Sequence, residues 1–477
     1  MRKPLALCSA LLLTACIDAP WTTPQVAEVK QADLGLTGAA APHFPQEWWR
    51  AFHDPQIDRL AQQVIARNPT LTGALARMRA AQAELAVNQA QDLPQVTLDG
   101  NEQRTLFSNN YIIPPPYGGS WRWFGSLTAN LNWNLDFWGK QAALIARARN
   151  SAEAAALHAQ AAGLALSGAM AQAYIALLLD YQNGDIADAT VAEREGILRI
   201  SQGRFGAGLE NGSAVAQARS LLSIAKAEQE RYAAAREMDI HAIAALAGEG
   251  AGGYAAITRP KPDLDVVLPL PDRLPADLLA RRPDILAAKA RVEAALKGRE
   301  AAHADFYPDI NLTALAGFQA IGLSNLISAN SFTMGVGPAI HLPIFDAGKL
   351  KAQYARSTAD LDLAVADYNG AVLNAIKQTA DAMTQARSLG IQRVQQQAAV
   401  TEAARAFDIA QERYRSGLAT QLPVLTAEAT LLQARSNLAG VIAQGAQQRI
   451  TLLLTVGGGF EPSQSETKIA TPDIRHD

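Results

Sequence analysis

Residues 131–140, LNWNLDFWGK, determine how the rest of the chain is interpreted. From Ser126 to Phe137 apolar and polar residues alternate strictly, and this period of two predicts a β-strand over about 124–137 with one apolar and one polar face. A strand of this length can cross a membrane as part of a barrel wall. Strands of soluble sandwiches show the same alternation, so the stretch alone leaves both structures open.

The composition excludes some classes of partner. The chain has 477 residues and a net charge of −3, which gives no global basic field for nucleic acid. Aromatic residues make up only 6%, and long segments are rich in Ala, Leu, Gln, Arg and Glu, which favours long helices.

The N-terminus has the pattern of a targeting segment. Arg2 and Lys3 precede a short apolar run at 5–13, which is followed by Leu13-Thr14-Ala15-Cys16. This order resembles the bacterial lipobox, which implies a signal peptide at 1–15, lipid attachment at Cys16 and an anchor and leader at 16–46. Ile17 does not match the inner-membrane retention signal, so the outer membrane is the expected destination. The alternative is an ordinary secretory signal with an incidental cysteine.

The sequence repeats itself at a nearly constant offset. Residues 204–209 correspond to 413–418 at 413 − 204 = 209, and Asn68-Pro69 corresponds to Arg282-Pro283 at 282 − 68 = 214. We therefore expect a first repeat at 47–248 and a second at 276–460. A proline-rich linker at 249–275 would join them, and a polar tail would follow at 461–477.

Each repeat is predicted to contain helix, strand, strand, very long helix and helix. The expected strands are 95–106, 124–137, 309–319 and 333–345. The expected long helices start at Lys140 and Lys349 and end near 206 and 413. They are followed by helices at 214–246 and 420–456, and shorter helices are expected at 55–92 and 275–305. Four strands cannot close a barrel, so membrane insertion would require several chains to associate.

Several motifs in this order resemble the TolC-like outer membrane factor family, in its lipoprotein branch (NodT type). They are Trp48-Trp49-x-x-Phe52-x-Asp54-Pro55, Trp133-x-x-Asp136-x-Trp138-Gly139-Lys140, Arg281-Arg282-Pro283-Asp284, Phe345-Asp346-x-Gly348-Lys349 and Arg413-Tyr414-x-x-Gly417. The resemblance implies a homotrimer with a twelve-stranded transmembrane β-barrel and a long periplasmic helical tunnel. It also implies a periplasmic adaptor and an inner-membrane pump as partners, and efflux of small toxic compounds across the outer membrane.

The same resemblance assigns the tips of the helical hairpins to adaptor docking. The residues concerned are Arg204, Phe205, Gly208, Leu209, Arg413, Tyr414, Gly417 and Leu418. The simpler interpretation of these residues is a helix C-cap, with glycine in the left-handed conformation and arginine near the carbonyl end.

The tunnel mouth departs from the family pattern. Channels of this family often carry an aspartate pair after the second tip, but the matching positions here are Pro423 and Thr426. A polar or tip-packing closure is expected instead. The candidate residues at the mouth are Glu210, Gln421, Thr426 and Glu428.

No catalytic or cofactor site is expected. The seven histidines are scattered without a pairing typical of metal sites, and Gly139-Lys140 lacks the spacing of a phosphate loop. Two other functions stay open: the outer-membrane conduit of a type I protein secretion system, and a periplasmic coiled-coil scaffold without a pore.

Overall fold

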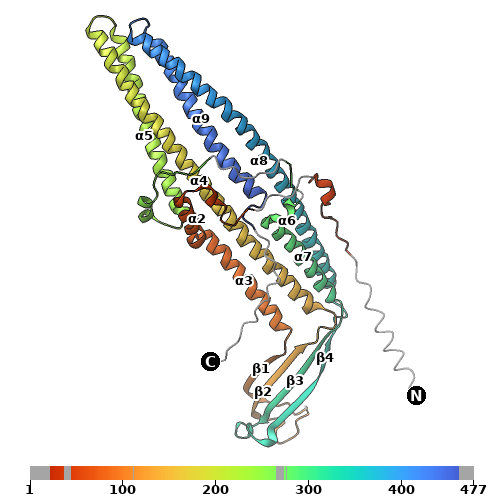
Figure 1. Cartoon of the computed structure of the whole chain (residues 1–477). Helices are drawn as coiled ribbons and strands as arrows, with labels where there is room; N and C mark the ends of the chain where they lie inside the picture. Colours follow the sequence, from red (N-terminus) through yellow and green to blue (C-terminus); the bar gives the residue numbers. More distant parts are fainter. Residues whose placement is uncertain (1–21, 37–43, 111, 265–272, 276, 461–477) are drawn as a thin grey trace. The chain divides into compact units, whose positions relative to one another are not determined.

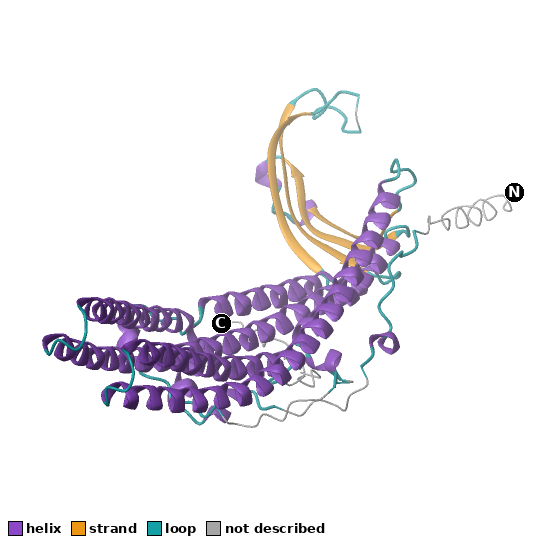
Figure 2. Ribbon diagram, turned by 90° about the horizontal axis from the view of Figure 1, so that it is seen from above, coloured by secondary structure: helices purple, strands orange, loops and turns teal. Residues whose placement is uncertain are grey.

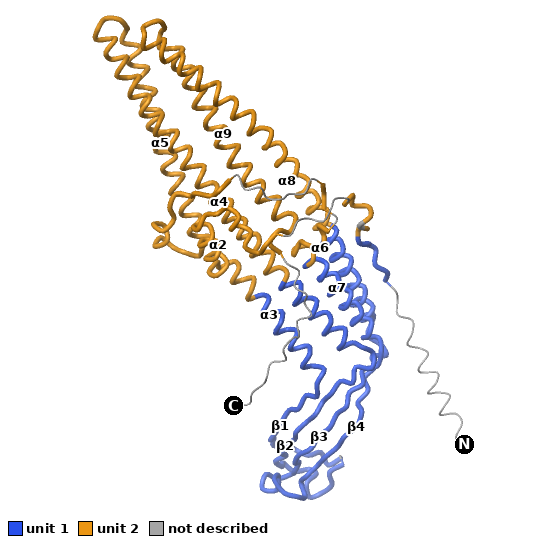
Figure 3. The backbone as a smooth tube through the Cα atoms, viewed as in Figure 1, with its two compact units in different colours: residues 1–28, 77–156, 287–369 blue, residues 29–76, 157–286, 370–477 orange. Residues whose placement is uncertain are grey.

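The computed structural model describes residues 22–36, 44–110, 112–264, 273–275 and 277–460. Cys16, the signal peptide and the tail at 461–477 lie outside these residues. The chain divides into two compact units, one of residues 1–28, 77–156 and 287–369, the other of residues 29–76, 157–286 and 370–477 (Figure 3). Each unit contains segments from both halves of the sequence.

The element order of the first half recurs in the second (Figure 1). The first half contains α2 (Pro55–Arg67), α3 (Pro69–Gln91), β1 (Gln95–Leu106), β2 (Trp121–Asn134), α4 (Lys140–Gly206) and α5 (Gly212–Leu246). The second contains α6 (Leu278–Arg281), α7 (Pro283–Ala304), β3 (Asp309–Ile321), β4 (Phe332–His341), α8 (Lys349–Arg415) and α9 (Gln421–Thr455). Both α4 and α8 have 67 residues, and both α5 and α9 have 35.

The strands form one antiparallel sheet in the order β1-β2-β3-β4, which curves as a single surface (Figure 2). The register aligns Leu98 with Ala129, Ala129 with Ala316, and Ala316 with Met334. The neighbouring row on the other face contains Thr97 and Asn130. The predicted separation of an apolar and a polar face is therefore confirmed on β1 and β2, whereas β3 places Leu315 opposite Asn130 in the polar row. Within this chain β1 and β4 each have a partner on one side only.

The end of β2 lies earlier than predicted. The strand stops at Asn134 because Asp136 adopts a positive φ and its carboxylate accepts hydrogen bonds from the backbone N–H groups of Gln141 and Ala142. Asp136 thus caps the start of α4, and Gly139 (φ 72°) supplies the left-handed residue before it. The motif Phe-Trp-Gly-Lys is a strand-to-helix turn, in which Trp138 stacks on Tyr307 at 5.0 Å.

Prolines explain two further differences from the predicted boundaries. β4 ends at His341, so Pro343 lies outside it, and Pro338 is tolerated because β4 is an edge strand in this chain. The helix expected at 55–92 is interrupted at Asn68, since the following Pro69 disfavours a helical conformation there. Asn68 instead accepts a hydrogen bond from the N–H of Thr70 at 2.8 Å.

The main hydrophobic core lies in the second unit. Trp48, Trp49 and Phe52 are buried there beside α2, α4, α5 and α9. Asp54 follows this aromatic group, caps α2 through the N–H of Gln56 and accepts a hydrogen bond from the Tyr174 hydroxyl at 2.6 Å. One window of α4 is apolar enough to cross a membrane by composition, but 44% of it is buried within the described structure, as in a core helix.

The segment after α5, where we expect the proline-rich linker at 249–275, begins with residues that pack on the second unit. Residues 251–256 form a short 3-10 helix, and Ile257 is buried in the core. The Thr258 N–H donates to the Gln56 side chain at 2.9 Å. The glycines at 248–253 therefore belong to a segment that packs against α2 as far as Thr258.

The same backbone junction occurs after α5 and after α9. Gly248 (φ 72°) and Gly457 (φ 76°) both adopt the left-handed conformation. A Cβ at Gly248 would lie 2.6 Å from the carbonyl oxygen of Arg67, and a Cβ at Gly457 would lie 2.1 Å from that of Arg281. Glycine is required at both positions for conformation and for space.

We predict that Gly457→Ala destabilises the protein. The left-handed conformation alone costs a residue with a side chain about 1–2 kcal/mol, and the contact with the Arg281 carbonyl adds to this cost. The apparent Tm in detergent should fall. Gly440→Ala is the control, because that glycine lies inside α9 with open space around it and alanine favours helix. An equal Tm for the two variants would contradict the prediction.

Candidate functional site

The α4–α5 and α8–α9 hairpins end in the same type of turn. Gly208 (φ 72°) and Gly417 (φ 73°) are left-handed, and the N–H groups of the next residues, Leu209 and Leu418, donate to the carbonyls of Arg204 and Arg413 at 2.9 and 2.8 Å. This is the geometry of a helix C-cap. The interpretation of the Arg-aromatic-x-x-Gly motif as a helix C-cap is therefore confirmed.

The predicted tip residues separate into two groups. Phe205, Leu209 and Leu418 expose 52%, 69% and 73% of their surface. Large apolar side chains at this exposure, on adjacent turns, form a candidate contact surface for another protein. Tyr414, which aligns with Phe205 in the repeat, is only 1% exposed and packs between helices.

Tyr414 also connects the two hairpins. Its hydroxyl donates to Glu210 Oε2 at 3.3 Å, and the Arg204 guanidinium lies over its ring at 5.2 Å. Arg204 Nε lies 3.4 Å from the same Glu210 oxygen. Burial raises the pKa of Tyr414, so the phenol stays protonated and acts as a hydrogen-bond donor. Arg204, Glu210 and Tyr414, here called the tip network, thus hold one hairpin end against the other.

The four candidate mouth residues have different environments. Glu210 belongs to the tip network, and Thr426 is exposed, with its hydroxyl donating to the carbonyl of Leu422 at 3.0 Å. Gln421 and Glu428 are buried, because positions 421, 424, 425 and 428 share the face of α9 that packs inside the helices. Within this chain Gln421 and Glu428 face neighbouring helices, and their role at the mouth stays a prediction.

Glu428 has a partner that the sequence did not suggest. It is fully buried, and its Oε1 lies 3.0 Å from Nε of Arg194 on α4, whose side chain is 8% exposed. Burial raises the pKa of Glu428 to about 7; Arg194 opposes this shift and the neighbouring Glu193 adds to it. No motif marks Arg194, and only long-range packing brings it to α9.

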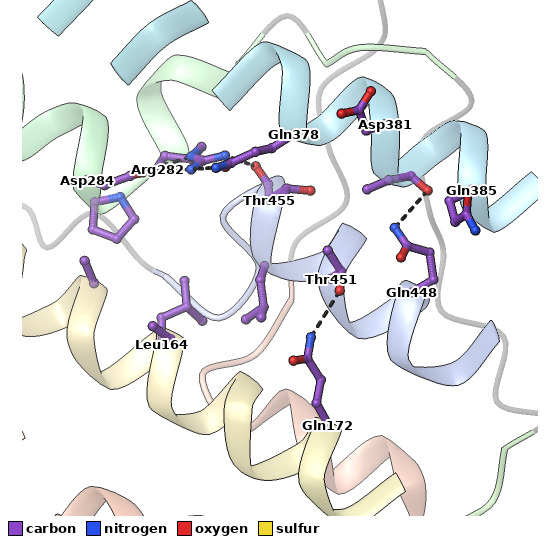
Figure 4. A pocket seen from close by; sticks show the side chains of 15 residues that line it. Leu164, Gln172, Arg282, Asp284, Gln378, Asp381, Gln385, Gln448, Thr451 and Thr455 are labelled. Carbon is purple, nitrogen blue, oxygen red and sulfur yellow. Dashed lines mark hydrogen bonds and ion pairs between the residues drawn. The ribbon is translucent and has the colours of Figure 1, made fainter. Parts of the chain in front are cut away.

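A second feature missed by sequence reasoning is the role of Arg282, in the Arg-Arg-Pro-Asp motif. Its guanidinium donates to Asp284, to Gln378 of α8 and to the carbonyl of Thr455 at the end of α9 (Figure 4). These groups border a cavity of about 720 Å³ that is also lined by Leu164 and Gln172 of α4. Because the guanidinium makes four hydrogen bonds with its five N–H groups, Arg282 connects three helices and leaves little capacity for a ligand.

The described residues contain no group of three or more His, Cys, Asp or Glu side chains placed to hold a metal ion. His303 contacts the rings of Tyr307 and Tyr354 at 5.6 and 6.0 Å, which fits a packing role.

Comparison with known proteins identifies the family. The family model described as "Outer membrane efflux protein" matches residues 60–249 and 274–458. The fusaric acid resistance protein FusA of Burkholderia cepacia is 34% identical over 362 residues, covering 74% of this chain and 68% of that protein. The multidrug resistance outer membrane protein MdtP of Escherichia coli is 30% identical over 481 residues, covering 96% and 97%.

Solved structures confirm the fold class. The outer membrane protein VceC of Vibrio cholerae superposes with a TM-score of 0.83 at 32% identity, covering 88% of this chain and 100% of that one. The CmeC outer membrane channel of Campylobacter jejuni gives a TM-score of 0.84 at 22% identity, which shows the shared fold. The family match agrees with the four-stranded sheet and the two helical hairpins of the structure. The chain therefore belongs to the outer membrane efflux protein family, as its TolC-like motifs predicted.

Proposed function

We propose that three copies of this chain close a twelve-stranded barrel in the outer membrane and continue as a helical tunnel. The observation that carries this proposal is the apolar face that runs across all four strands while β1 and β4 keep one unpaired edge each. Unpaired backbone groups are too costly in lipid, so each edge needs a strand from another copy.

The channel would serve a tripartite efflux system for small toxic compounds. Relatives named for fusaric acid resistance and for multidrug resistance support this cargo class. The chain carries no recognised motif for energy conversion, so an inner-membrane pump would drive transport and a periplasmic adaptor would join pump and channel. The exposed apolar tip residues support adaptor docking, and the tip network would close the mouth where the family often has aspartates.

Lipid attachment at Cys16 is part of the proposal, and the first described residues support it. The Gln25 and Val26 N–H groups donate to Asp362 of α8, and the Thr22 carbonyl accepts from Arg299 of α7 at 3.2 Å. α7 ends five residues later at Ala304, shortly before β3 begins. Thr22 is 22 − 16 = 6 residue steps from Cys16, and these can span about 20 Å, enough for the lipid to reach the membrane at this end of the sheet.

The proposal predicts a transport phenotype. Cells that lack this gene should accumulate more of a fluorescent efflux dye and of fusaric acid, and the intact gene should restore the low level. Cys16→Ala should reduce the restoration and abolish labelling by radioactive palmitate. Unchanged accumulation in a strain without redundant channels, together with loss of a secreted protein, would instead favour a type I secretion conduit.

The barrel predicts a face-specific effect of charge. Leu131→Arg places a cation on the apolar face and should cost about 2–4 kcal/mol per chain if that face contacts lipid. Asn132→Arg is the control, because Asn132 neighbours it on the polar face. The measurement is the amount of heat-modifiable oligomer in outer-membrane fractions. Equal amounts for both variants would favour a scaffold without a pore.

The docking role predicts that Leu418→Glu weakens binding of the adaptor by at least about tenfold, as expected when a charge enters an apolar contact. Ile224→Glu is the control, since Ile224 on α5 is also exposed but lies away from the tips. Binding can be measured by surface plasmon resonance with the adaptor encoded beside this gene. Equal losses for both variants would show that the tip has no special role.

A further inference from the structure

The Arg194–Glu428 pair has an unusual combination of burial and poor hydrogen bonding. Nε of Arg194 lies 3.0 Å from Oε1 of Glu428, within ion-pair distance. Among the described residues, however, neither carboxylate oxygen of Glu428 has a hydrogen bond of acceptable geometry, and Nη1 of Arg194 has none either. A buried carboxylate that is charged but not hydrogen-bonded is costly, so this site favours the neutral acid.

The charged groups around Glu428 partly cancel one another. From α4, Arg194 favours the carboxylate while Glu193 opposes it, and Arg435 on α9 offsets the charge of Glu193. Arg194 also borders a cavity of about 760 Å³, and the polar side chains that the other two helices contribute to it are neutral amides, Gln217 of α5 and Gln396 of α8. Among the described residues, no cation other than Arg194 acts on the pKa of Glu428.

The pair lies close to the hairpin tips. Glu428 is seven residues from Gln421, the first residue of α9, or about 10 Å along the helix. Its neighbours Leu425 and Leu431 pack in the same buried cluster as Tyr414 of the tip network. A change in how α9 packs on α4 at Glu428 would therefore be transmitted directly to the tips.

We propose that Glu428 and Arg194 form a proton-operated latch of the tunnel mouth, in which protonated Glu428 keeps α9 packed on α4 and ionised Glu428 favours a hydrated, open arrangement. This proposal rests on the channel function proposed above. Glu428 and Arg194 are positioning residues, because they act on the mouth through the packing of the helices and not by contact with the cargo.

The direction of the pH effect follows from linkage. In the described structure, which the proposal takes as the closed arrangement, the pKa of Glu428 is about 7, whereas hydration in an open arrangement would return it towards its usual value of 4.5. The closed state then binds the proton more tightly, so acid favours closure. As pH rises between these two values, the open-to-closed ratio increases by up to about tenfold per pH unit, and it levels off above about pH 7.

The test is the conductance of the purified full-length channel in planar lipid bilayers of fixed composition, between pH 5 and 8.5. The wild type should open more as pH rises towards 7. Glu428→Gln is neutral at every pH and should stay at the low-pH level throughout. Glu412→Gln is the control: this glutamate is exposed on α8 near the tip, so its variant should keep the wild-type profile.

A second variant tests the latch without altering the buried pair. Burial is the main cause of the raised pKa of Glu428, and Glu193→Gln removes the repulsion that adds to it, so the transition should move to lower pH. A wild-type profile in Glu428→Gln, or a transition that moves to higher pH in Glu193→Gln, would overturn the latch. Channels with a flat pH profile would also overturn it but leave the channel function intact, whereas a wild type without any conductance would contradict the channel function itself.

Discussion

The unpaired backbone of β1 and β4 constrains everything else in this protein. A sheet whose apolar face is continuous over four strands is stable in lipid only when both edges find partners. One chain cannot provide them, so its sequence must specify an edge-to-edge fit with further copies. The register is pinned by the alternation itself, since a slip of one residue would turn every apolar side chain to the polar face. The two repeats supply the β1–β2 and β3–β4 hairpins, which together form the sheet and its two edges.

The helices extend the same duplication. Because α4 equals α8 in length and α5 equals α9, the two hairpins turn at matching positions and their tips come together. The two repeats differ in individual side chains at the tips. Phe205 is exposed where its counterpart Tyr414 is buried, and the added hydroxyl of Tyr414 is the group that binds Glu210. The first tip thus presents the apolar ring of Phe205 to its surroundings, whereas the hydroxyl of Tyr414 joins the second tip to the first.

The sequence predicts those features that are encoded locally. Alternation identified the strands, and the glycines after Arg204 and Arg413 identified the tips, because both signals depend on neighbouring residues. The strand end at Asn134 was missed because the Asp136 cap overrides the alternation. Glu428 was named as a mouth candidate because it is an acidic residue on α9 close to the positions of the missing aspartate pair, and the sequence does not show which face of α9 is buried. Arg194 is 428 − 194 = 234 residues away, and no local pattern could pair the two.

In a mouth closed by carboxylates, the acidic groups face one another across the opening. The acidic groups near the tips of this chain are placed differently. Thr426 stands at one of those positions, and its hydroxyl is engaged by its own helix. The acidic groups Glu210 and Glu428 are each engaged within the chain, by Arg204 and Arg194. Mobile ions screen exposed charges but reach a buried pair poorly, whereas a proton can neutralise it directly. Control of this mouth through Glu428 would therefore respond to pH far more than to ionic strength.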